Sequence, residues 1–233
     1  MSGSDKKRTP RKPREASKQP AQPALGGAAF GGMMKNGWRL LALVILVAAG
    51  YFLWPRTPSL SVFEPGRMAQ LQVDVWKKAK ARHRWEMAAI FYRIYSGQYG
   101  CYPYASLKMA KFSADAVIVF RAAPDAADQE KAIEPLNKVF DLLTTQTKAT
   151  FDPYAAAQME LQIWSLRANG GRQAELTTAL SEQLALVHGK PSEDCLPAAK
   201  KFVLAMRAAD KGQWSESVLQ DKEAWAKLKP LAK

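Results

Sequence analysis

Residues 40–54 read LLALVILVAAGYFLW, a run of fifteen residues without a charged side chain. A helix of this length extends about 22 Å, which is less than the ~30 Å hydrocarbon core of a bilayer. Trp38 and Trp54 flank the run where interfacial aromatic residues are common, and the long side chain of Arg39 can extend its charge toward the headgroups. We therefore predict a single transmembrane anchor at residues 38–55.

The charges on the two sides of this run predict its orientation. Residues 1–39 contain nine Lys or Arg and two acidic residues, whereas the twenty residues after Trp54 contain only two basic ones, Arg56 and Arg67. Cytoplasmic flanks hold the excess of basic residues, so the N-terminus should stay inside and the C-terminal domain should cross. We expect a bacterial inner-membrane protein with a cytoplasmic N-terminus and a periplasmic domain.

A cleaved signal peptide is the alternative interpretation of the same run. Translation from Met33 or Met34 would leave a short basic segment, an apolar stretch and small residues at 47–49 before a cleavage site. The apolar residues 51–54 continue past that point and favour an uncleaved anchor. Both interpretations export the large domain.

Residues 1–37 form a basic tail of low complexity. Large apolar residues are rare in it, so burial cannot offset the entropy lost on ordering, and we predict a disordered tail. Seven basic residues between Lys6 and Lys18 suit anionic lipid headgroups. No aromatic residues alternate with them as in single-strand binding sites, so nucleic acid is not predicted as a partner. The net charge of +13 divides into +7 for residues 1–39 and +6 for the remainder.

Residues 63–233, which follow a short linker at 56–62, predict an all-α domain. Glu64-Pro65 and Asp152-Pro153 are typical helix starts, because proline is tolerated in the first turn. Pro135 lies inside an apolar helical pattern and should kink or divide that helix. The β-branched residues at 117–119 would suit a short strand, but no second such run exists to pair with it. We expect eight or so helices in an antiparallel bundle or a short α-solenoid.

Three helix junctions, at residues 81–88, 168–175 and 209–216, share a small residue, a polar or glycine turn and an acidic helix start. They resemble the junctions of tetratricopeptide repeats, most closely at Trp85-Glu86-x-Ala88 followed by Phe91-Tyr92. The regular period of about 34 residues is absent. The resemblance implies a stack of antiparallel helix pairs with a concave protein-binding face, and an ordinary helical bundle is the alternative.

The two cysteines, Cys101 and Cys195, both follow the apolar run. In an oxidising compartment they are candidates for one disulfide. The bridge would close a loop of about 95 residues and stabilise the domain by roughly 4–5 kcal/mol. Two separate buried thiols are the alternative. Neither cysteine lies in a CxxC motif, so redox catalysis is not predicted.

Residues suited to catalysis or metal binding are sparse. The two histidines, His83 and His188, have no second ligand one turn away, so we predict neither a metal site nor a cofactor. His188 ends a predicted helix, where the dipole favours an imidazolium ion. The chain contains no GxSxG, phosphate-loop or HExxH motif, and we do not predict an enzyme.

Two groups of residues are candidates for a recognition surface. The basic cluster is Lys77, Lys78, Lys80, Arg82 and Arg84, and the aromatic loop is Tyr99, Tyr102 and Tyr104 around Cys101 and Pro103. The basic cluster suits anionic headgroups or an acidic partner, or it is a solvated helix face. The aromatic loop suits protein recognition, because tyrosines add contact area at low entropy cost, or it caps the core. Four tryptophans on apolar helix faces are predicted to be core: Trp85, Trp164, Trp214 and Trp225.

These features favour a non-enzymatic, membrane-anchored periplasmic scaffold or assembly factor that binds another envelope protein. An accessory subunit of an integral membrane complex, held through the transmembrane helix itself, is the second hypothesis. An envelope enzyme or ligand-binding protein without a recognisable motif is the third, and a concave pocket with convergent polar groups would support it.

Overall fold

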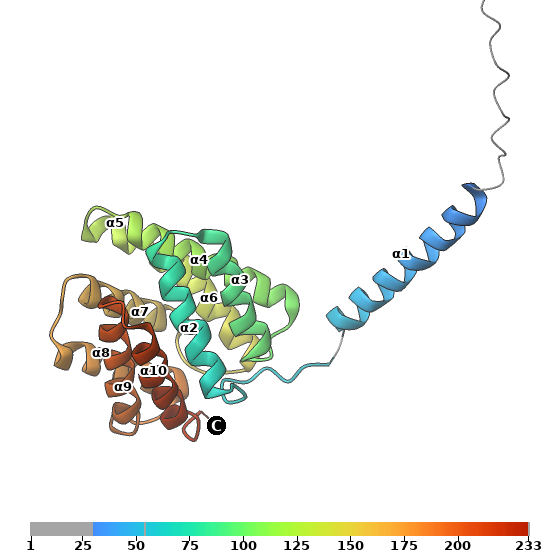
Figure 1. Cartoon of the computed structure of the whole chain (residues 1–233). Coiled ribbons are helices and arrows are strands. Elements are labelled where there is room, and N and C mark those ends of the chain that lie inside the picture. Colours follow the sequence, from blue (N-terminus) through green and yellow to red (C-terminus); the bar gives the residue numbers. More distant parts are fainter. Residues whose placement is uncertain (1–29, 54, 233) are drawn as a thin grey trace, which may run out of the picture. The chain divides into compact units, whose positions relative to one another are not determined.

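A computed structural model describes residues 30–53 and 55–232 of the 233-residue chain (Figure 1). The predicted basic tail lies outside the described residues as far as residue 29, and so does Trp54 at the end of the predicted anchor. The chain divides into two compact units, residues 1–49 and residues 50–233, which are considered separately.

Helix α1 (Phe30–Leu53) contains residues 40–53 of the apolar run and begins ten residues before it. Large apolar side chains from Leu40 to Val47 point to every side of the helix and are between 52% and 69% exposed. Trp38 is 72% exposed, and the side chain of Arg39 lies outside the described residues. Within residues 30–53 and 55–232, no helix is long and apolar enough to cross a membrane.

The second unit is built from α-helices alone, as predicted, and its described residues contain no β-strand. Its helices are α2 (Pro65–Lys80), α3 (Arg84–Gly97), α4 (Pro103–Ala122), α5 (Ala126–Glu130), α6 (Ile133–Thr147), α7 (Pro153–Ala168), α8 (Gln173–His188), α9 (Ser192–Asp210) and α10 (Trp214–Leu228). Apart from the short α5, each helix packs on the next one along the chain. Helix α10 also packs on α2, which closes the helices into a ring (Figure 1). An open stack of repeats, as the tetratricopeptide resemblance implies, would leave those two helices apart.

The helix starts follow the local chemistry of the sequence. The carboxylate of Glu64 accepts a hydrogen bond from the Gly66 N–H at 2.9 Å, and that of Asp152 accepts one from the Tyr154 N–H at 2.9 Å. Pro135 lies in the first turn of α6, where its missing N–H breaks no helical hydrogen bond. The predicted division of this segment is therefore confirmed, with α5 as the separate piece.

Trp225 of α10 joins the two ends of the ring. Its ring makes edge contacts with Phe63 and with Phe202, at centroid distances of 4.9 and 5.0 Å. Its indole N–H donates a hydrogen bond to the Gln72 side-chain oxygen on α2 at 2.9 Å. Trp225 is 9% exposed, which confirms it as a core residue. These contacts fasten the last helix of the domain to the first.

Cys101 and Cys195 are both free thiols and fully buried. Cys101 packs in an apolar cluster with Met109, whereas Cys195 packs in a separate cluster with Phe202. The structure therefore does not form the predicted disulfide: both thiols are free, and they pack in two different apolar clusters. Burial raises the pKa of the Cys101 thiol to about 12 and also raises that of Cys195.

Candidate functional site

The ring surrounds a cavity of about 560 Å³. Side chains from α2, α3, α4, α6, α7, α9 and α10 line it, so the cavity exists only when the ring is closed. We call it the aromatic cavity, because nine of its lining residues are aromatic: Trp76, Phe91, Tyr95, Tyr99, Phe120, Phe140, Trp164, Trp214 and Trp225. A volume of this size lies within the usual range of ligand pockets.

Helical spacing brings the cavity's side chains onto inward faces. Glu160 and Trp164 are one turn apart on α7, and Phe91 and Tyr95 are one turn apart on α3. The rings of Phe120 on α4 and Trp164 on α7 meet edge to face, with centroids 5.4 Å apart. This aromatic contact links α4 and α7, which both pack on α6, and stabilises the wall of the cavity.

Glu160 is an acidic residue in this aromatic wall. One of its carboxylate oxygens accepts a hydrogen bond from the Trp164 indole N–H at 2.6 Å, and the other accepts one from the Gln183 amide. Both donors are neutral, and among the described residues no cation forms an ion pair with Glu160. Burial raises the pKa of the Glu160 carboxyl group, because the charged form loses hydration without gaining a cationic partner.

Basic residues surround the mouth of the cavity. Lys80 and Arg121 line the cavity and are also exposed, so the cavity reaches the surface where α2 and α4 end. Neither side chain forms an ion pair with a described residue. Arg167 lies beside them but is paired with Asp210 at 2.7 Å, and its guanidinium lies 4.7 Å from the centre of the Trp76 ring. The mouth therefore presents two cations that are free to meet an anionic group.

Apolar side chains line the floor of the cavity, at the end away from its mouth. Met68, Leu143 and Trp225 line the end away from Lys80, and each is at most 9% exposed. A molecule that enters from the mouth would pass the cations first, then the aromatic wall with Glu160, and would reach this apolar floor last.

The five residues of the predicted basic cluster have different surroundings. Of its five members only Lys80 lines the aromatic cavity. Lys78 pairs with Glu86, and Arg84 donates a hydrogen bond to Asp115 at 2.7 Å. Lys77 pairs with Asp74 at 3.4 Å, and the Arg82 side chain donates to the Arg121 carbonyl at 3.4 Å.

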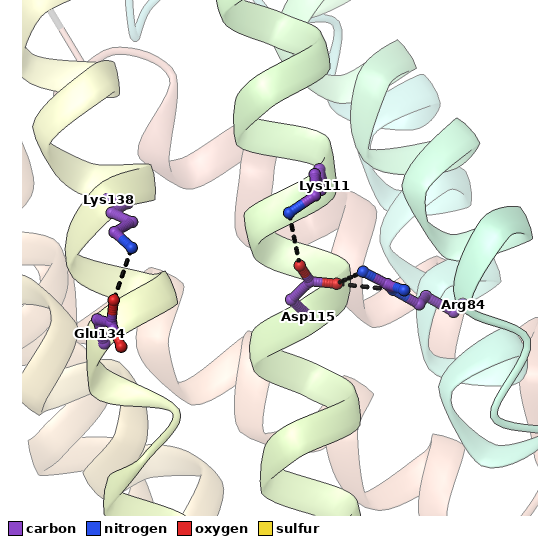
Figure 2. Close-up of polar contacts among 5 residues, drawn as sticks. All are labelled: Arg84, Lys111, Asp115, Glu134 and Lys138. Atoms are coloured by element: carbon purple, nitrogen blue, oxygen red, sulfur yellow. Dashed lines mark hydrogen bonds and ion pairs between the residues drawn. The ribbon is translucent and has the colours of Figure 1, made fainter.

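Asp115 shows how these cations are neutralised. Figure 2 shows its carboxylate on α4 between Arg84, which reaches across from α3, and Lys111 on its own helix. The neighbouring pair of Glu134 and Lys138 on α6 is 2.6 Å apart. Arg84 thus belongs to an ion-pair network on the outside of the ring and not to the cavity.

The aromatic loop is also divided by the structure. Tyr99 lines the cavity next to Tyr95, with ring centroids 6.4 Å apart, and burial raises its pKa. Tyr102 and Tyr104 point outward and are 40% and 63% exposed. The loop therefore supplies one residue to the cavity and two to the outer surface.

Among the four tryptophans predicted to be core, the prediction for Trp85 is wrong. It is 75% exposed at the start of α3, where the Arg84 guanidinium lies 5.2 Å from its ring centre. Trp164 and Trp214 are only partly buried, because they face the aromatic cavity. The sequence reasoning missed Glu160 and Arg121, although an acid one turn before Trp164 on an apolar helix face was a readable signal.

Of the two histidines, His188 lies in a largely buried place. Burial lowers the pKa of His188 to about 4, with Lys190 nearby, so the predicted imidazolium ion is wrong. His188 lies in a second hollow of about 770 Å³, formed largely by loops at the other end of the ring. No group of His, Cys, Asp or Glu within the part of the chain that the structure describes could hold a metal ion.

Comparisons of the chain with protein-family models, with curated proteins and with solved structures give no match.

Proposed function

We propose that this chain is a membrane-anchored helical scaffold or assembly factor that binds a segment of another envelope protein in its aromatic cavity. The nine aromatic side chains of the cavity carry this proposal. Aromatic rings offer large contact areas and lose little side-chain entropy, and they are enriched at the centres of protein interfaces.

Charge at the mouth supports a partner of a particular chemistry. Lys80 and Arg121 have no ion-pair partner among the described residues and stand where a bound segment would leave the cavity. A segment with apolar or aromatic residues and a neighbouring acidic residue is complementary to this arrangement. Such charge pairs at the rim act mainly on specificity and on the association rate.

Membrane anchoring is proposed from the run at residues 40–54. Its large apolar side chains from Leu40 to Val47 are exposed on every side of α1, and a helix that is apolar all round needs an apolar environment. The proposed span at 38–55 has its N-terminus in the cytoplasm and its domain in the periplasm of a bacterium. The basic tail would then lie against anionic headgroups of the inner leaflet.

Photocrosslinking in intact membranes tests the proposed binding site. A photoreactive residue at Phe120 would point into the cavity, whereas the same residue at Leu219, which is 50% exposed on α10, would point away from it. We expect position 120 to give one discrete protein adduct and position 219 to give none. Adducts of equal yield at both positions, or none at position 120 under efficient crosslinking, would rule out the cavity as the binding site.

The exposed apolar surface of α1 also favours a second candidate, an accessory subunit that joins a membrane complex through this helix. Replacing residues 40–54 with an unrelated anchor separates the two candidates. The position-120 adduct survives the exchange if the cavity carries recognition, and it disappears if the membrane helix does.

A further inference from the structure

The predicted linker at 56–62 is fastened to the loop between α3 and α4. The Arg56 guanidinium donates to the carbonyl oxygens of Ser96 and Cys101 at 3.3 and 3.2 Å. The Tyr102 hydroxyl donates to the Arg56 carbonyl at 3.4 Å, and the Ser59 N–H donates to the Tyr99 carbonyl at 3.0 Å. The chain is thus held to the domain at residues 56 and 59.

This attachment limits how far the domain can lie from the apolar run. Arg56 follows Leu53, the last residue of α1, by three residues. Three residues span at most about 11 Å when fully extended. If the run lies in a bilayer, the loop around Tyr102 must therefore lie close to the surface of that bilayer.

The start of α4, directly after this loop, carries an exposed stripe. We define the α4 stripe as Tyr104, Leu107, Lys108 and Lys111, which recur every three or four residues and so share one side of the helix. Tyr104 and Leu107 are 63% and 61% exposed, and the Lys108 ammonium lies 4.5 Å from the centre of the Tyr104 ring.

The charge of the α4 stripe is positive. Lys108 has no ion pair with any described residue. Lys111 shares Asp115 with Arg84, so this one carboxylate serves two cations (Figure 2). Proteins that lie on lipid present these residue types on one exposed face. Aromatic rings and apolar side chains lie at the level of the headgroups, and lysines interact with the anionic charge of the headgroups.

We propose that the α4 stripe lies on the anionic headgroups of the same bilayer that holds residues 40–54. This inference rests on the membrane anchoring proposed above. The proposed contact also sets the orientation of the aromatic cavity relative to the bilayer. Arg121 at the mouth is seventeen residues beyond Tyr104, about 25 Å further along α4. The mouth then lies at the far end of α4 from the loop that meets the bilayer, where a partner can reach it.

Spin labels on the full-length chain in nanodiscs test this arrangement. Leu107→Cys places a label on the α4 stripe, and Leu219→Cys is the matched control on α10. The native Cys101 and Cys195 are fully buried and stay unlabelled in the folded protein. In discs with phosphatidylglycerol, we expect the label at 107 to become more accessible to oxygen and less accessible to a water-soluble nickel complex. The label at 219 stays accessible to nickel.

Charge reversal tests the lipid chemistry. Lys108→Glu should abolish the difference between positions 107 and 219, and Lys200→Glu, which makes the same change at an exposed site on α9, should leave it intact. Equal nickel accessibility at both positions in anionic discs overturns the α4 stripe as a lipid contact. Equal shifts in discs of phosphatidylcholine alone overturn the role of anionic lipid.

A carbonate extraction tests membrane anchoring separately from the contact of the α4 stripe. If alkaline carbonate releases the full-length protein from vesicles, membrane anchoring is wrong and the contact of the α4 stripe is wrong with it. If the protein stays bound but the two labels behave alike, only the contact of the α4 stripe fails.

Discussion

Glu160 accepts a hydrogen bond from the indole N–H of Trp164, one turn away on α7, at a distance of 2.6 Å. The pair places a carboxylate in the aromatic wall of a cavity that opens between two cations, Lys80 and Arg121. It also ties the wall to α8, because Gln183 donates to the other carboxylate oxygen. The candidate binding site and the packing of the ring therefore depend on the same side chain.

Glu160→Leu should destabilise the domain by about 1–3 kcal/mol, because the Trp164 and Gln183 donors lose their acceptors in a buried place. Glu160→Gln keeps one acceptor and should cost less. Urea unfolding followed by circular dichroism measures both. The control is Glu182→Leu on the exposed side of α8, expected to change the unfolding free energy by less than about 0.5 kcal/mol. A larger effect at position 182 than at 160 would contradict this assignment.

Asp221 predicts a pH dependence of stability. Its side chain is fully buried, and neither carboxyl oxygen has a hydrogen-bond partner among the residues that the structure describes. Burial raises its pKa well above the usual 3.8. The native state therefore prefers the protonated form, and the unfolding free energy falls as the pH rises above about 3.8.

Asp221→Asn removes this ionisation. The variant should match the unaltered protein in unfolding free energy near pH 4 and exceed it by about 1–3 kcal/mol near pH 8. Urea titrations at the two pH values check this, with the exposed Asp141→Asn as the control. If the two proteins have parallel pH profiles, Asp221 finds a partner in solution and the reasoning is wrong.

Trp85 and Trp225 both occur in apolar helical patterns, but truncating each to alanine should change the stability of the domain by different amounts. Trp225→Ala removes the contacts that close the ring and should cost about 3–5 kcal/mol. Trp85→Ala removes a side chain that is 75% exposed and should cost less than about 1 kcal/mol. Thermal unfolding compares them directly, and equal losses would mean that the ring does not close through Trp225.

Gly171 tests the turn between α7 and α8. A Cβ atom there would lie 2.8 Å from the Leu166 carbonyl oxygen, so Gly171→Ala should destabilise the domain by about 1–3 kcal/mol. Gly97→Ala is the matched control, because a Cβ atom at the end of α3 meets nothing within 4 Å. A tolerated alanine at 171 would show that this turn can relax.

Local chemistry in the sequence predicted the helices but not their closure into a ring. Caps and proline positions, such as Asp152-Pro153, act within one turn and can be read directly from the residues. The bond between Trp225 and Gln72 joins residues 153 positions apart, and no local pattern reports such a contact. The aromatic cavity forms only through this closure, so local sequence patterns could not predict it either.

Other predictions differ from the structure because they too depend on the packing of neighbouring helices. Trp85 and Trp225 both occur in apolar helical patterns, and only the packing of neighbouring helices decides that one is exposed and the other buried. His188 does end a helix, as predicted, but burial outweighs the favourable dipole and lowers its pKa to about 4. The expected compartment predicts a cysteine pair, whereas in the structure the two free thiols pack in different apolar clusters.

The free cations at the mouth should contribute to partner binding. The double change Lys80→Glu and Arg121→Glu should lower the yield of the position-120 adduct about tenfold, since reversed charge at an interface costs more than about 1.4 kcal/mol. Lys200→Glu with Lys227→Glu makes the same change in net charge on the outer surface and should leave the yield unchanged. An equal loss in both double variants would point to net charge alone.

Mapping the attachment site of the adduct is the most direct test of the proposed function. The adduct formed from position 120 in intact membranes is digested, and the attached partner residue is identified by mass spectrometry. We expect attachment within one segment that has apolar or aromatic residues next to an acidic one, as the aromatic cavity and its mouth require. Attachment scattered over many unrelated proteins, or a segment without apolar residues, would contradict the proposal that this cavity recognises a partner.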